Sequence, residues 1–166
     1  MSQKTLSNFN KLFVEFKTAL LNDEAIRKLL FYDTPDALNR TAPTIEEVSN
    51  YIFVAPIMES GITDFGRNTY IMIDIPNIDL DDTDGSGLIG MIYITPVTNY
   101  EHWMLNDNKM RLFEIAERVL QDIDDRKFSP SGKSTVMSIE RVLISKQLYG
   151  YAIKVATTDD SGKSNL

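Results

Sequence analysis

The residues best suited to chemistry are four aspartates gathered in one segment, Asp79, Asp81, Asp82 and Asp84. Carboxylates at alternate positions before a glycine are the ligands of an EF-hand calcium loop. Counted back from Gly85, two of the aspartates fit that spacing, but position 80 is Leu and the closing acid would fall on Met91. We therefore expect no metal site. The segment is interpreted either as a solvated hairpin tip or as a loop that builds a negative ring with its copies.

His102, the single histidine, is the second candidate for chemistry. It lies between Glu101 and Trp103, and a His–Glu pair can act in acid–base catalysis. Neighbours in an extended segment point to opposite faces, however, and no serine or cysteine nucleophile motif accompanies them. The chain has no cysteine, which excludes thiolate zinc sites. We expect His102 to be structural or to lie in an interface, and we expect no catalytic residue and no cofactor.

Aromatic side chains beside this histidine are candidates for protein contacts. Tyr100 and Trp103, together with Met104, would anchor their loop to the core or to a partner subunit. A Gly-Lys-Ser triplet at 132–134 superficially resembles a phosphate-binding loop. It lacks the earlier glycine, since position 127 is Lys, and it precedes a strand instead of following one. Nucleotide binding is therefore not expected.

Composition narrows the function further. The chain has 166 residues and a formal net charge of −7, and its basic residues never cluster in runs longer than two. Phosphate contacts dominate nucleic-acid affinity, so direct DNA binding is not expected as the main function. No run of about 18 apolar residues would span a membrane, and the N-terminus lacks a signal-peptide core. An intracellular origin fits these features.

The elements that must position these side chains follow from hydrophobic periodicity. Helices are expected at 6–20 and 26–30 with a break at Asn22-Asp23, then strands at 51–58, 70–75 and 88–97, a helix at 107–124 capped by Asn106, and strands at 134–145 and 148–157. Thr44 and Glu47 form a capping-box pattern. Pro56 places the first strand at an edge or a bulge, and Pro96 closes the third.

The helix at 107–124 has the clearest pattern. Its expected buried face consists of Leu112, Ile115, Ala116, Val119 and Ile123, while Arg111 and the other charged residues are expected to point away. Hairpin-like connections predict an α+β fold, with a mainly antiparallel sheet of about five strands and helices packed on one face. Residues 1–157 are expected to form this single domain, followed by a flexible polar tail at 158–166.

Several segments share their order with one family of proteins. They are 26–32 with the following Pro35 and Leu38, then 52–56, 91–94, Trp103, the arginine-led stretch 111–116, and 148–151. In this order they resemble tail-terminator, or tail-completion, proteins of tailed bacteriophages, especially those that infect Gram-positive bacteria. The resemblance covers most of residues 24–157.

The resemblance implies a structural virion protein, assembled in the host cytoplasm and located in the tail or neck. Its subunits would close into a hexameric ring on the last ring of the tail tube and end tube polymerisation. The partners implied are further copies of the chain, the tail tube protein, a head-completion or neck protein, and a tail sheath where the tail is contractile. DNA would pass through without specific binding, and no membrane is involved.

Three alternatives remain at this point: another neck or tail component such as a head-completion or tube protein, a small enzyme, or a calcium-binding module. The acidic loop suggests a specific role for four aspartates within such a ring. If Asp79, Asp81, Asp82 and Asp84 line the channel, they would repel DNA phosphates and let the genome slide.

Overall fold

Apolar residues spaced three or four apart form helices at the start of the chain. In the computed structural model, which describes residues 7–54, 68–79, 89–128 and 132–158, α1 spans Ser7–Asn22 and α2 spans Glu24–Phe31. Asp23 separates them because its carboxylate accepts a hydrogen bond from the Ile26 N–H at 3.0 Å and caps α2. The predicted break between the two helices is confirmed.

Short helical turns connect α2 to the sheet. They are η1 (Ala37–Asn39), α3 (Ile45–Val48) and η2 (Ser49–Tyr51). The predicted capping box of α3 is present, since the Glu47 N–H donates to Thr44 Oγ1 at 3.3 Å and the Thr44 N–H donates to Glu47 Oε2 at 2.8 Å. These two bonds fix the direction in which the chain enters the first strand.

The described residues form one six-stranded sheet with the order β1-β2-β3-β6-β5-β4. Its strands are β1 (Ile52–Val54), β2 (Thr69–Asp79), β3 (Ile89–Asn99), β4 (Lys127–Phe128), β5 (Gly132–Leu143) and β6 (Leu148–Thr158). Only β1 and β2 pair in parallel, so the prediction of a mainly antiparallel sheet is confirmed. The two-residue strand β4 was not predicted because it is too short to show a period.

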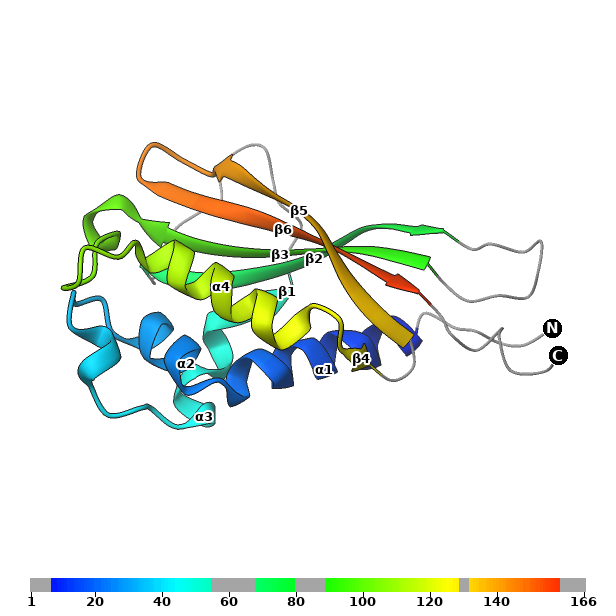
Figure 1. The fold of residues 1–166 in the computed structure, drawn as a ribbon, viewed down its shortest axis with the longest axis horizontal. Helices are drawn as coiled ribbons and strands as arrows, with labels where there is room; N and C mark the ends of the chain where they lie inside the picture. The colour runs from blue at the N-terminus through cyan, green and yellow to red at the C-terminus, as the bar shows by residue number, and fades with distance from the viewer. Residues whose placement is uncertain (1–6, 55–67, 80–88, 129–131, 159–166) are drawn as a thin grey trace, which may run out of the picture.

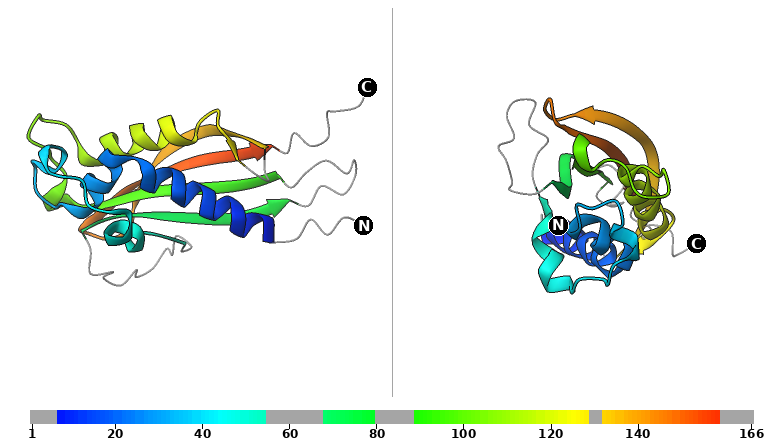
Figure 2. Two further views of the ribbon diagram at one scale, coloured as in Figure 1. Left: turned by 90° about the horizontal axis from the view of Figure 1, so that it is seen from below. Right: turned by 90° about the vertical axis from the view of Figure 1, so that its left-hand side faces the viewer.

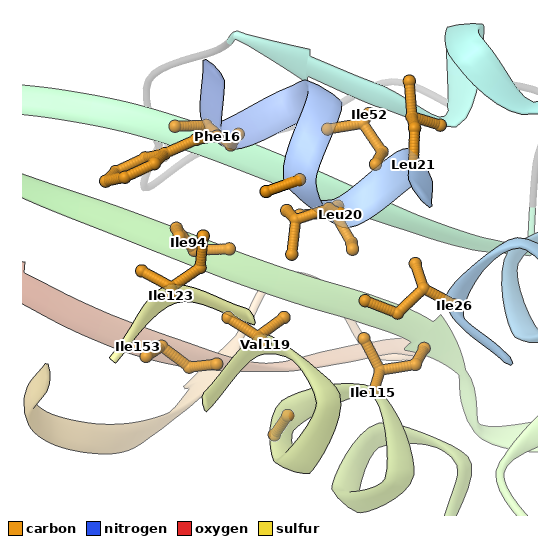
Figure 3. Packing of buried hydrophobic residues seen from close by; sticks show 14 of the residues in the cluster. Phe16, Leu20, Leu21, Ile26, Ile52, Ile94, Ile115, Val119, Ile123 and Ile153 are labelled. Carbon is orange, nitrogen blue, oxygen red and sulfur yellow. The ribbon is translucent and has the colours of Figure 1, made fainter. Parts of the chain in front are cut away.

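The core lies between the sheet and the helices α1, α2 and α4 (Arg111–Ile123), which cover one face (Figure 1). Figure 3 shows Ile94 and Ile153 of the sheet facing Phe16, Leu20 and Val119 of the helices. The five predicted apolar positions of α4 are all buried. The predicted α+β fold, with helices packed on one side of the sheet, is therefore confirmed.

Several predicted boundaries are wrong. The helix predicted from 107 begins at Arg111, and Met110 stands at its N-cap in place of Asn106. Asn108 has a φ of 57°, a left-handed conformation that a helix cannot include. The strand β3 continues through Pro96 to Asn99. The strand predicted at 51–58 is seen over Ile52–Val54, and Pro56 lies outside the described residues.

The elements divide the molecule into two ends. At one end α1 begins, β2 and β6 finish, and β3 starts (Figure 1). At the other end lie η1, the start of α4, the turn between β5 and β6, and η3 (Tyr100–His102), the short turn after β3. The predicted interface aromatics belong to this second end.

Candidate assembly surfaces

Arg111 is the central residue of the second end and is completely buried. Its guanidinium donates four hydrogen bonds to backbone carbonyls: Nε to His102 at 2.8 Å, NH1 to Leu29 and to Tyr32 at 2.7 Å each, and NH2 to Thr34 at 2.8 Å. Two of these carbonyls terminate α2, where a positive charge complements the helix dipole. The expectation that Arg111 points away from the core is wrong.

Burial lowers the pKa of Arg111, and the nearby charge of Asp33 acts in the opposite direction. The Asp33 carboxylate is held in place by Asn68, whose Nδ2 donates to Oδ2 at 2.7 Å. The backbone oxygen of the same aspartate lies 2.9 Å from Nδ1 of His102. His102 thus links η3 to the end of α2. Whether it also contacts a partner subunit stays a prediction.

The segment from Tyr100 to Trp103 is fixed from both sides. The Tyr100 N–H donates to the Gln147 carbonyl at 3.0 Å, and the Trp103 carbonyl accepts from the Arg111 N–H at 2.7 Å. The Trp103 ring stacks on Tyr149, with centroids 5.4 Å apart and planes 24° apart. Half of the Tyr100 side chain remains exposed. We call Tyr100 and Trp103 the aromatic platform, and their predicted role in an interface stays a prediction.

A second apolar surface lies on the edge of the sheet. Three residues of β5 stand directly opposite residues of β6: Ile139 opposite Ile153, Arg141 opposite Tyr151, and Leu143 opposite Tyr149. Residues paired in this way share a face of the sheet, and Ile153 belongs to the helix-covered face. Ile139 is nevertheless 43% exposed and Leu143 is 66% exposed. We call Ile139, Arg141 and Leu143 the β5 edge patch.

The backbone of this patch is available for pairing. The Ile144 N–H donates to the Leu148 carbonyl at 3.1 Å, and antiparallel ladders alternate between bonded and unbonded positions. The N–H and C=O groups of Ile139, Arg141 and Leu143 therefore point away from β6. Among the described residues, the outer side of β5 is bonded only near its start. There it pairs with β4 at Gly132 and Lys133, and it bonds Asp125 and Arg126 at Ser134 and the Asp124 carboxylate at Val136. Such an edge is a template for a strand from another chain.

The other candidate site residues from the sequence either have structural roles or lie outside the described residues. Asp81, Asp82 and Asp84 lie outside the described residues, and of Asp79 only the backbone at the end of β2 is described. In the Gly-Lys-Ser triplet, Lys133 pairs with Asp125, and the Ser134 hydroxyl donates to the carbonyl of Ile123. This serine therefore fastens the end of α4 to β5.

In the described part of the chain, no group of three or more His, Asp or Glu side chains could hold a metal ion. A shallow depression of about 470 Å³ is lined by Asp23, Glu24, Ala25, Lys28, Leu38 and Arg118. No described helix is long and apolar enough to cross a membrane.

One carboxylate beside that depression has an unusual environment. Burial, followed by the charge of Asp23, raises the pKa of Asp122 to about 6, although Arg126 and Arg118 act in the opposite direction. The buried Oδ2 of Asp122 accepts no hydrogen bond from any described residue. The charged form of this side chain is therefore unfavourable in the folded protein.

Replacing Asp122 with asparagine should raise the free energy of unfolding by about 1 kcal/mol at neutral pH, a figure reduced for solvent screening of this half-buried group. The folded pKa lies above the unfolded one, so protonation of Asp122 stabilises the protein below about pH 4, and this is lost as the pH rises through about 6. Urea unfolding of both proteins between about pH 5 and about pH 8 measures the difference. A difference that does not grow with pH would contradict the prediction.

Comparisons with known proteins agree with the fold. The family model YomW matches residues 23–157. No curated protein matches the sequence. Among solved structures, a chain of the virion of a native gene transfer agent particle is similar, with a TM-score of 0.53 and 11% identity. The match covers 93% of this chain and 98% of that chain. At this identity the likeness concerns the fold.

Proposed function

The chain belongs to the YomW family, and from its fold and its unpaired sheet edge we propose that it is a structural subunit of a phage-like virion. The specific role that we propose for it is that of a tail terminator. Copies of the chain close into a ring, which we propose to be hexameric, at the end of the tail tube. The ring stops tube growth and joins the tail to the head-completion or neck proteins. The proposal involves no catalytic step and no cofactor.

The observation that carries the proposal is the outer side of β5 from Ile139 to Leu143, which pairs with no strand among the described residues. Its outward backbone groups and its exposed apolar side chains would bind an extended segment of another protein. A subunit that assembles into a ring needs such a surface. In a ring this surface must meet a different surface on the next copy, because rings are built from head-to-tail contacts and close when the rotation between copies permits.

The fold likeness supports the same reading. The similar chain belongs to the virion of a gene transfer agent particle, and nearly the whole of both chains takes part in the match. The resemblance of the sequence to tail terminators supports a position for the ring at the junction of tail and head. In this arrangement the loop of Asp79, Asp81, Asp82 and Asp84 faces the channel and repels DNA phosphates.

The aromatic platform is assigned to contacts with the neighbouring ring or neck protein. Tyr100 and Trp103 are held by backbone hydrogen bonds and by stacking, so they would lose little freedom on binding. Aromatic residues of this kind are enriched in protein interfaces. Both proposed contacts lie at the same end of the molecule, beside the turn between β5 and β6 (Figure 1).

Removing the gene from a phage or particle that encodes this chain should produce tail tubes that grow beyond their normal length and stay unattached to heads. Negative-stain electron microscopy measures tube length, and supplying the wild-type gene in trans is the control. Tubes of normal length that fail to join heads would point to a neck protein and contradict the terminator role. Particles unchanged in shape and infectivity would overturn the virion role altogether.

A further inference from the structure

The two edges of the sheet differ in charge. The hairpin of β5 and β6, residues 132–158, has four basic side chains and one acidic side chain, a net charge of +3 in a chain of −7. The opposite edge, residues 44–54, comprises α3, η2 and β1 and has two acidic residues, Glu46 and Glu47, and no basic one. Lys133 already pairs with Asp125. Arg141 and Lys146, which are exposed at the unpaired end of β5, are therefore the basic groups relevant to a partner.

Both edges also expose apolar side chains, and they do so on the same face of the sheet. Val54 of β1 is aligned with Ile73, which is buried in the main core beneath the helices, yet Val54 is 56% exposed. Leu143, on the opposite edge, belongs to the same helix-covered face. In Figure 2 (right), α3 and β1 in cyan lie on the opposite side of the molecule from β5 in orange. A sheet continued from one copy into the next would bring these side chains together.

The strand directions allow that continuation. Because β1 is parallel to β2 and each later pairing as far as β5 is antiparallel, β1 and β5 run in opposite directions. In a ring whose axis lies along the strands, rotation keeps each strand direction unchanged. The outer side of β5 would then meet β1 of the next copy as an antiparallel pair, the commoner of the two kinds of strand pairing.

We propose that the β5 edge patch of one copy binds the α3–β1 edge of the next copy, with Arg141 and Lys146 facing Glu46 and Glu47. This inference deepens the proposed function and rests on it for the closure of the contact into a ring. The alternative, β5 against β5 in a symmetric dimer, would place basic side chains opposite one another, and like charges directly opposite destabilise a strand pair. Opposite charges on the two edges also favour the correct orientation of approach.

Cysteine cross-linking tests the contact, since the chain has no cysteine of its own. The variants are Val54→Cys and Leu143→Cys, both at exposed positions. Mixed together with a short bismaleimide, they should give a covalent dimer, while each variant alone stays uncross-linked. The double variant should give a ladder of sizes that ends at the ring. Val14→Cys, an exposed position on α1, is the matched control and should cross-link with neither.

Charge reversal provides a second measurement on the same mixture. Arg141→Glu in the Leu143→Cys chain should lower the cross-linking yield several-fold, and Glu46→Lys in the Val54→Cys chain should restore it. Cross-linking of Leu143→Cys with itself would overturn the proposal in favour of a symmetric β5 pair. Absence of any cross-link up to the highest soluble concentration would overturn it as well.

The outcomes separate this inference from the proposed function. If tube length depends on the protein but the two edges never cross-link, the edge contact is wrong and the tail-terminator role stands. If the edges cross-link as expected while particles lacking the protein are normal, the contact is correct and the virion role fails.

Discussion

Replacing Arg111 with methionine should lower the free energy of unfolding by about 3–5 kcal/mol, the range for removing one member of a buried charged network. Methionine retains the apolar stem of the side chain, so the loss reports mainly on the guanidinium. Four carbonyl oxygens, those of Leu29, Tyr32, Thr34 and His102, would lose a charged donor inside the protein. The C-terminus of α2 would also lose the cation that complements its dipole.

Urea unfolding followed by circular dichroism measures the change, and a fall in melting temperature of about 10 °C or more is expected with it. The fluorescence of Trp103, the only tryptophan, reports whether the aromatic platform loosens before the rest unfolds. Arg111→Lys should recover only part of the stability, because an ammonium cannot match the planar fork of a guanidinium.

Arg118→Met is the matched control on the same helix. Arg118 is partly exposed and lies 3.8 Å from the Asp23 carboxylate, so its removal should change the free energy of unfolding by less than about 1 kcal/mol. If Arg111→Met behaves like this control, the buried hydrogen-bond network contributes little, and the stability of this end must come from the packing around it.

Arg111 also shows what the sequence could and could not reveal. It stands four residues before Ile115 and eight before Val119, so the helical period places it on the buried face. Residue type argued the other way, because arginine is rarely buried. The helical period predicted the burial of this position correctly. An arginine at a position that the period buries was itself the sign of an unusual environment. Three of its four carbonyl partners lie roughly 80 positions earlier in the chain and could not be deduced from local pattern.

The elements were predictable to a useful extent because their signals are local. Two-residue alternation revealed the last strand, β6, and the capping box marked α3. The order of the strands was not predictable, since it depends on β3 pairing with β6 across α4. That long-range pairing is what leaves β5 near the edge and creates the β5 edge patch. The stacking of Trp103 on Tyr149 depends on the same pairing.

The junction between β3 and β6 gives the second large prediction: Gly150→Ala should destabilise the protein by about 2 kcal/mol. A Cβ at this buried position would stand 2.8 Å from the Pro96 carbonyl oxygen and 3.2 Å from a methyl group of Thr95 and of Val97. Conformational entropy alone predicts the opposite sign, a gain of about 0.4–1 kcal/mol for replacing glycine by alanine. The sign of the measured change therefore decides between the two effects.

The steric clash should outweigh the entropy gain because the nearest atom, the Pro96 carbonyl oxygen, belongs to the backbone of a central strand and cannot rotate away. Gly150→Ala combined with Val97→Ala tests this reason, since the second change removes the methyl at 3.2 Å and leaves the carbonyl at 2.8 Å. We expect the two changes to be coupled by less than about 0.5 kcal/mol in urea unfolding, although neighbouring residues commonly couple by more. A larger favourable coupling would mean that the valine methyl is the obstacle and that β3 and β6 can adjust. Little coupling would mean that β3 and β6 are held rigidly where Val97 pairs with Gly150. A sheet that carries the proposed contacts from one subunit to the next needs such rigidity.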